Sequence, residues 1–117
     1  MIGRVLLGIV LTLVVLATCR AAQAQLYVER VQLVRVTYYV STGNPTASGA
    51  WPVAGWTAAC SFDLPLGTWV RLPDGVDRQC VDRGQLTPTW VDIYVDSHAE
   101  GRALIGVVGE TAIAEVW

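Results

Sequence analysis

The stretch Cys80-Val81-Asp82-Arg83-Gly84, followed by Trp90-Val91-Asp92-Ile93-Tyr94-Val95, places two carboxylates in two short apolar runs joined by a polar segment. Both runs read as strands, and Pro88 between them excludes a helix there. A carboxylate at an apolar run is costly to bury unless it faces a cleft or finds a partner. Asp82 and Asp92 are therefore the residues from which a functional site in this chain is sought first.

Six short segments of the chain are predicted to form strands. They are rich in β-branched or aromatic residues, and turn-forming clusters such as Leu64-Pro65-Leu66-Gly67 and Pro73-Asp74-Gly75 separate them. The predicted strands are residues 31–40, 56–59, 68–72, 78–81, 90–95 and 111–116.

One helix is predicted, because Ser97-His98-Ala99-Glu100 has the form of a capping box. The helix is expected to span residues 98–104 and to end at Gly106. Six strands with many turns favour a closed barrel over a sandwich, since a barrel removes the edges that so short a chain could not cover. The predicted fold class is all-β, a small six-stranded β-barrel with one short helix.

Residues 1–24 are predicted to be a signal peptide. Arg4 gives a positive start, and the apolar run of residues 5–17 is short for a membrane span. Ala22-Gln23-Ala24 has the small-x-small pattern that precedes a cleavage site. The alternatives are an uncleaved anchor and lipidation at Cys19.

The remaining residues 25–117 are predicted to form one domain, which meets the membrane only through the amino-terminal segment. This part carries six arginines and ten acidic residues, a formal charge of −4. A negative domain lacks the basic face that nucleic acid requires, so no nucleic-acid partner is expected. Export would place the domain in the periplasm, the cell envelope or the extracellular space.

Cys60 and Cys80 remain as an even pair after the signal, which favours a disulfide in an oxidising compartment. The bridge would close a loop of about twenty residues and contribute about 3 kcal/mol. Two separate buried thiols are the alternative. A zinc site needs more ligands than two cysteines and His98 provide, so neither a metal nor another cofactor is predicted.

Asp82 and Asp92 are the first candidates for chemistry. Partial burial raises the pKa of a carboxyl group, which suits a general acid working near neutral pH. The structural alternative is that Asp82 caps the turn before Gly84 and that Asp92 pairs with an arginine such as Arg83. His98, beside the predicted cap, is interpreted as a solvated helix residue.

Aromatic residues are numerous for so short a chain. Flat rings stack on the apolar faces of sugars, so an exposed cluster would suit a polysaccharide groove, while about half of the rings are expected in the core. The set comprises Tyr38, Tyr39, Trp51, Trp56, Trp69, Trp90, Tyr94 and Trp117.

Six motifs occur in an order that resembles a double-psi β-barrel. The nearest resemblance is to the three-aspartate (3D) domain and to the barrel of rare lipoprotein A, which are related to the barrels of membrane-bound lytic transglycosylase A and the expansins. It covers about residues 34–117. The motifs are Val36-Thr37-Tyr38-Tyr39, Thr46-Ala47-Ser48-Gly49, Thr57-Ala58-Ala59, Leu64-Pro65-Leu66-Gly67-Thr68-Trp69-Val70, Val81-Asp82-Arg83-Gly84 and Val91-Asp92-Ile93-Tyr94.

The resemblance implies that Asp92 is a catalytic general acid and that Asp82 assists it in the same groove. One departure is Cys60, which stands where the family has a polar or acidic residue. Asp63 could replace that residue from a shifted position. The residues implied in substrate binding are Tyr38, Tyr39, Thr46, Ser48, Trp90 and Tyr94.

The implied function is binding and cleavage of peptidoglycan glycan strands, as in a lytic transglycosylase or glycosidase. The expected partner is peptidoglycan or another wall polysaccharide, and the protein is expected to be a monomer. The first alternative is a non-catalytic, expansin-like module that binds wall polysaccharide. A further alternative is a secreted inhibitor or toxin-like barrel that acts on another protein.

Overall fold

The computed structural model of the chain describes residues 30–117. The predicted signal peptide, residues 1–24, lies outside this range, as does Cys19. Among the described residues, no helix has both the length and the apolar character needed to cross a membrane.

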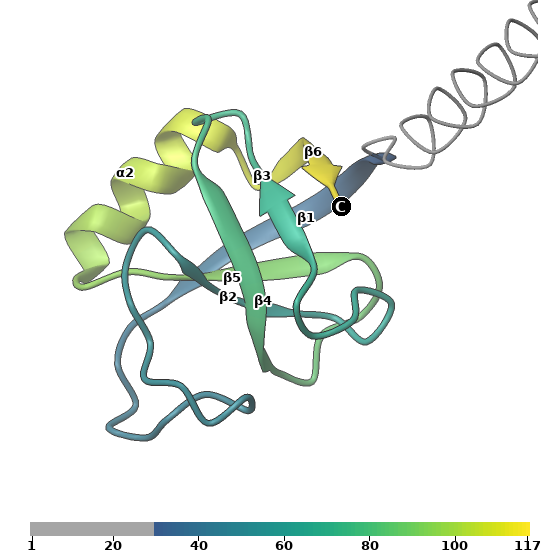
Figure 1. Ribbon diagram of the computed structural model, residues 1–117. Coiled ribbons are helices and arrows are strands. Elements are labelled where there is room, and N and C mark those ends of the chain that lie inside the picture. Colours follow the sequence, from purple (N-terminus) through teal and green to yellow (C-terminus); the bar gives the residue numbers. More distant parts are fainter. Residues whose placement is uncertain (1–29) are drawn as a thin grey trace, which may run out of the picture.

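Six strands form a closed barrel in the order β1-β5-β2-β4-β3-β6, and β6 pairs back with β1 (Figure 1). One helix, α2 (His98–Val108), lies alongside the barrel in the same view. The six-stranded barrel with one short helix predicted from the sequence is confirmed. The strands are β1 (Arg30–Tyr39), β2 (Thr57–Cys60), β3 (Trp69–Arg71), β4 (Asp77–Arg83), β5 (Trp90–Tyr94) and β6 (Thr111–Val116).

The barrel combines two parallel strand pairs with four antiparallel ones. The parallel pairs are β1 with β5 and β2 with β4, and such pairs need crossover connections rather than hairpins. The short strand β2 therefore has a parallel partner, β4, on one side and an antiparallel partner, β5, on the other. Strand β2 thus lies between β4, which carries Asp82, and β5, which carries Asp92.

Alternation along the strands separates the core from the outer wall of the barrel. On β1, Val34 and Val36 are buried, while Arg35 between them is exposed. On β5, Val91 and Ile93 are fully buried, and Asp92 between them is only half-buried. Apolar side chains from all six strands thus fill one interior cluster, to which β4 contributes Cys80.

The predicted disulfide is present in the core. Cys60 on β2 and Cys80 on β4 are bonded, with their Cα atoms 5.6 Å apart, and both are fully buried. Disulfides form and persist in oxidising compartments, so the bond is compatible with an exported location.

A register shift between β2 and β4 decides where Asp82 lies. Ala58 pairs with Cys80, whereas the next residue, Ala59, pairs with Asp82, so Val81 is the extra residue on β4. Without this irregularity Cys80 and Asp82 would share a face, because residues two apart in a strand point the same way. The shift lets Cys80 face the core and Asp82 face outward.

Helix α2 (His98–Val108) begins where the capping box predicts, with the Glu100 N–H donating to Ser97 Oγ over 3.2 Å. The predicted end near Gly106 is wrong, because the helix continues to Val108. Gly106 weakens the helix by about 1 kcal/mol relative to Ala, but Val108 is buried and the helix packs on β1. The end comes at Gly109, whose positive φ of 83° suits glycine.

Two glycines of α2 give opposite predictions for substitution by alanine. A Cβ at Gly101 would collide with the ring of Tyr38, whereas a Cβ at Gly106 meets nothing within 4 Å. Gly101→Ala should destabilise the fold by about 1–3 kcal/mol through overpacking. Gly106→Ala should stabilise it by about 1 kcal/mol through helix propensity. Chemical denaturation measures both, and a stabilising Gly101→Ala would contradict the helix packing.

Candidate functional site

Asp82 and Asp92 lie on the same outer face of the barrel, one on each side of Ala59. Ala59 is the register partner of Asp82 on β4 and of Asp92 on β5. Directly paired residues point to the same face of a sheet, so both carboxylates share the face of Ala59. Two strand spacings place their Cα atoms about 9.6 Å apart. Ala59, which lies between them in the sheet, has a small side chain and is itself buried.

Asp92 is held by a chain of two hydrogen bonds. Thr37, its partner in register on β1, donates from Oγ1 to Asp92 Oδ1 over 2.8 Å. Trp90 donates its indole N–H to Thr37 Oγ1 over 2.7 Å. A hydroxyl has one proton, so accepting from Trp90 directs that proton toward Asp92. Thr37 therefore fixes one oxygen of Asp92 and leaves the other without a hydrogen bond among residues 30–117.

Trp90 has a supporting position in this arrangement. The guanidinium of Arg35 lies over its ring, 4.1 Å from the ring centroid, which is a cation–π contact. One face of the indole is thus covered and its N–H is engaged. Trp90, predicted to bind substrate, accordingly lies beside Asp92 and orients Thr37.

Asp82 has both carboxylate oxygens occupied by donors. The Tyr39 hydroxyl donates to Oδ2 over 2.9 Å, and the backbone N–H groups of Ala47 and Arg83 donate to Oδ1, each over 2.9 Å. The Ser48 N–H also donates to the Val81 carbonyl over 3.0 Å. These bonds fasten the long connection between β1 and β2 to strand β4.

Thr46 and Ser48, which were predicted to bind substrate, stabilise that connection internally. Their hydroxyls are hydrogen-bonded to each other over 3.0 Å, and Thr46 Oγ1 donates to the Ala50 carbonyl over 2.8 Å. Thr46 is buried, whereas Ser48 is exposed. Of the two, Ser48 is the one whose position leaves it open to a ligand.

Burial is the chief reason why the pKa of Asp92 is raised above its usual value. The hydrogen bond from Thr37 acts in the opposite direction, and the nearby charge of Asp82 adds to the increase. Burial and the bond to Asp82 also raise the pKa of Tyr39 well above its usual range. Tyr39 therefore remains a protonated donor, and the Asp92 carboxyl holds its proton more readily than an ordinary aspartate does.

The predicted binding tyrosines fall on two faces of the barrel. Tyr39 and Tyr94 pair in register and meet edge to face, with their ring centroids 5.5 Å apart, beside the aspartates. Tyr38 points the other way, against α2, where its ring contacts Gly101 and lies 5.9 Å from His98. Tyr38 is thus outside the aspartate site.

Asp63 makes no hydrogen bond with Asp82 or Asp92 in the described part of the chain. It accepts hydrogen bonds from Ser61 Oγ over 2.5 Å and from Thr89 Oγ1 over 2.6 Å. Burial alone would raise the pKa of Asp63, but these two hydrogen bonds, a backbone hydrogen bond within Asp63 and the charge of Arg30 together lower it.

The alternative ion pair between Asp92 and Arg83 is wrong. Arg83 Nη1 donates to the backbone carbonyls of Cys60, Ser61 and Leu64 over 3.1, 2.8 and 2.6 Å. This guanidinium stabilises the turn after β2 and leaves Asp92 without a cationic partner in the described part of the chain. Across residues 30–117, no three His, Cys, Asp or Glu side chains come together in a way that could hold a metal ion.

Sequence reasoning did not single out Thr37 or the Ala47 amide as parts of the site. Thr37 is two residues before Tyr39, so strand alternation places the two side chains on one face and could have identified it. No sequence signal marks the backbone N–H of Ala47, since its role depends on how the β1–β2 connection folds.

The sequence matches no known protein-family model and no curated protein.

Removing the Thr37 hydroxyl should change the titration of Asp92. Thr37→Val keeps the shape of the side chain but removes the hydrogen bond that lowers the pKa of Asp92. The pKa of Asp92, followed by NMR of its side-chain carboxyl carbon, should therefore rise further. Thr111→Val is the matched control, because Thr111 is exposed at the start of β6, and it should leave the pKa of Asp92 unchanged. An Asp92 pKa that falls in Thr37→Val would contradict the proposed hydrogen bond.

The raised pKa of Asp92 also predicts a pH-dependent effect on stability. A carboxyl whose pKa rises on folding costs nothing below its usual value of 3.8, and it destabilises the fold as the pH rises through the folded-state pKa. Asp92→Asn should therefore unfold at a higher temperature than wild type at pH 7, with little difference near pH 3.

Asp77 provides a control of opposite sign. Its hydrogen bond from Arg71 lowers the pKa of Asp77, so its ionised form stabilises the fold above its usual pKa, and that stability is lost as the pH falls. Asp77→Asn should unfold at a lower temperature than wild type at pH 7. Thermal unfolding followed by circular dichroism measures the effect of Asp92→Asn and of Asp77→Asn. Equal effects of the two substitutions would contradict the opposite pKa shifts of Asp92 and Asp77.

Proposed function

We propose that this is an exported protein of the periplasm, cell envelope or extracellular space that binds peptidoglycan glycan strands and cleaves their glycosidic bonds at Asp92. The observation that carries the proposal is the shared outer face of Asp82 and Asp92, on which burial and the charge of Asp82 raise the pKa of Asp92. The Cys60–Cys80 disulfide supports export, since such bonds persist in oxidising compartments.

Asp92 acts as general acid in this proposal. Its carboxyl proton passes to the glycosidic oxygen as the bond from that oxygen to the anomeric carbon breaks. The 6-hydroxyl of the same sugar then bonds to the anomeric carbon, and its proton returns to Asp92, which closes an anhydro ring and restores the acid. Ordinary glycosidases need a second carboxylate as nucleophile or base. Both carboxylate oxygens of Asp82 already accept hydrogen bonds. Closure of the anhydro ring fits this arrangement, because it needs no second carboxylate.

Aromatic side chains around the site supply surfaces for sugar rings. Tyr39 borders the aspartates and is partly exposed, whereas Tyr94, which its ring contacts, is buried. Trp51 belongs to the connection that Asp82 fastens. Trp51 is 64% exposed, so its ring is free to stack on the apolar face of a sugar.

We also propose that the domain belongs with the three-aspartate and rare lipoprotein A barrels. Two features support this assignment: the closed six-stranded barrel has two parallel pairs, and the aspartates of the Val81-Asp82-Arg83-Gly84 and Val91-Asp92-Ile93-Tyr94 motifs share one face.

A non-catalytic polysaccharide-binding module is the second candidate. Cys60, at the position where the family has a polar residue, is locked in a disulfide, and Asp82 is fully engaged in structural hydrogen bonds. A site with a single free proton donor would bind glycan through its aromatic side chains without cleaving it.

Incubating the purified protein with peptidoglycan tests the proposal. Mass spectrometry should detect anhydro-muropeptides released by wild type, and Asp92→Asn should reduce the release about 10²- to 10⁴-fold, the usual contribution of a general acid. Asp96→Asn is the matched control, because Asp96 is an exposed aspartate that follows the same strand, and it should retain the wild-type rate.

The same samples separate the two candidates. If wild type and Asp92→Asn release equally little product but sediment with insoluble peptidoglycan, the protein is a binding module. A protein that neither sediments with the wall nor releases product is neither enzyme nor binder, and both candidates fail.

A further inference from the structure

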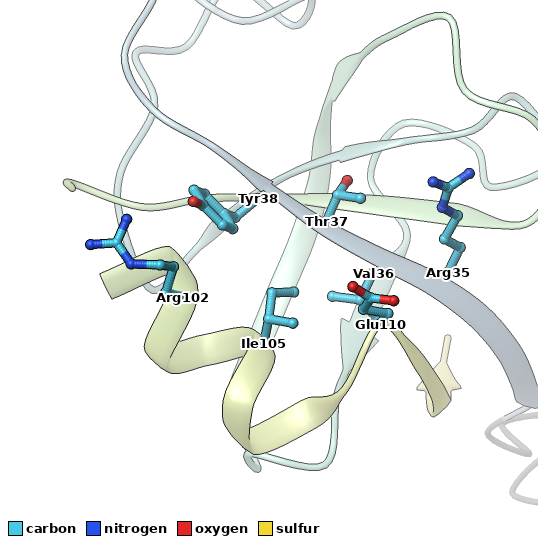
Figure 2. Close-up of a pocket in the computed structure, with 7 residues that line it drawn as sticks. All are labelled: Arg35, Val36, Thr37, Tyr38, Arg102, Ile105 and Glu110. Atoms are coloured by element: carbon cyan, nitrogen blue, oxygen red, sulfur yellow. The ribbon is translucent and has the colours of Figure 1, made fainter. Parts of the chain in front are cut away.

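Arg35 lies on the outer face of the barrel, beside the aspartate site. It precedes Thr37 by two residues on β1, so strand alternation points both side chains outward. In Figure 2 the Arg35 guanidinium and the Thr37 hydroxyl project to one side of β1, whereas Val36 and Ile105 lie on the other. Arg35 is therefore on the face that carries the hydrogen bond from Thr37 to Asp92.

Stacking holds the Arg35 guanidinium in place without using its hydrogen-bond donors. Arg35 pairs in register with Trp90, and its guanidinium carbon lies 4.1 Å from the centroid of the Trp90 ring. Among residues 30–117, this guanidinium makes no hydrogen bond or ion pair, and the residue is exposed. A planar group that is fixed on an aromatic ring still presents its N–H donors at its edge. The donors of Arg35 are thus oriented and open to a ligand.

The pair of Arg35 and Trp90 is the next row of the sheet beside the pair of Thr37 and Asp92. Both pairs are in register between β1 and β5, and Trp90 joins the two rows by donating to Thr37. Two residues of a strand cover about 6.6 Å, which one pyranose ring can span. A sugar joined to a glycosidic oxygen at Asp92 can therefore reach Arg35.

The connection between β1 and β2 limits how a glycan can lie on this face. The backbone N–H groups of Ala47 and Ser48 fasten the connection to strand β4. A chain of sugars that crossed the sheet from β5 to β4 would run into it. A chain laid along β1 instead meets partly exposed Tyr39 on one side of Asp92 and exposed Arg35 on the other.

We propose that the glycan lies along β1 and that Arg35 binds the sugar next to the cleaved bond by donating to hydroxyl oxygens of its ring. The inference rests on the proposed function, because it takes the glycosidic oxygen to lie at Asp92. The planar guanidinium donates two parallel hydrogen bonds to a pair of neighbouring oxygens. Two adjacent hydroxyl groups of one pyranose ring provide such a pair. A lysine ammonium is a point charge and cannot make this paired contact.

Arg35→Lys tests the paired contact, because it keeps the positive charge and removes the planar guanidinium. The probe is a soluble, peptide-free glycan fragment of peptidoglycan, and isothermal titration calorimetry measures its affinity. Arg35→Lys should bind about tenfold more weakly than wild type, since a hydrogen bond from a charged donor is lost. Arg102→Lys, at an exposed arginine of α2, is the matched control and should bind like wild type. Equal affinity of Arg35→Lys and wild type would overturn the inference.

Two further measurements separate the competing explanations. Fragments whose carboxylates are converted to amides should show the same difference, and a difference confined to unmodified fragments would overturn the assignment to hydroxyl oxygens. The pKa of Asp92, followed by NMR, should be the same in Arg35→Lys and wild type, and a changed pKa with weaker binding would give Arg35 a structural role instead. Failure of wild type to bind any fragment would overturn the proposed function, and with it the placement of a sugar at Arg35.

Discussion

The pairing of β2 with two strands at once is the constraint on which the rest of the structure depends. Its four residues are completely enclosed between β4 and β5, and the Cys60–Cys80 disulfide joins it covalently to β4. Ala59 is in register with Asp82 on β4 and with Asp92 on β5. The two aspartates therefore lie on one face, although β4 and β5 do not pair with each other. The supporting hydrogen bonds of Thr37 and Tyr39 follow from this placement, since β1 pairs with β5 beside it.

Much of the fold could be predicted from the sequence, because local signals and tertiary packing agree. The β-branched content of residues 111–116 predicted β6, and the capping box predicted the start of α2. The end of α2 was mispredicted because Gly106 is a local signal, whereas burial of Val108 is a tertiary effect. The register shift at Ala59 has no sequence signal, although it decides which residues of β4 face outward.

The site was predicted in part. Motif positions identified Asp82 and Asp92, and alternation shows why Tyr39 joins them and Tyr38 does not. The role of Trp90 could not be predicted, because an indole that donates to Thr37 and one that stacks on a sugar look the same in sequence. The disposition of the long connection after β1 likewise depends on its bonds to β4, which couple segments far apart in the chain.

The coupling of the two carboxylates is the most direct test of this account. Site-resolved NMR titration of Asp92 should be carried out in wild type and in Asp82→Asn, which removes the charge on the other side of Ala59 while keeping its size. Since the charge of Asp82 raises the pKa of Asp92, that pKa should fall in the variant while burial still holds it above the usual value. An Asp92 pKa that is the same in both proteins would contradict a shared site.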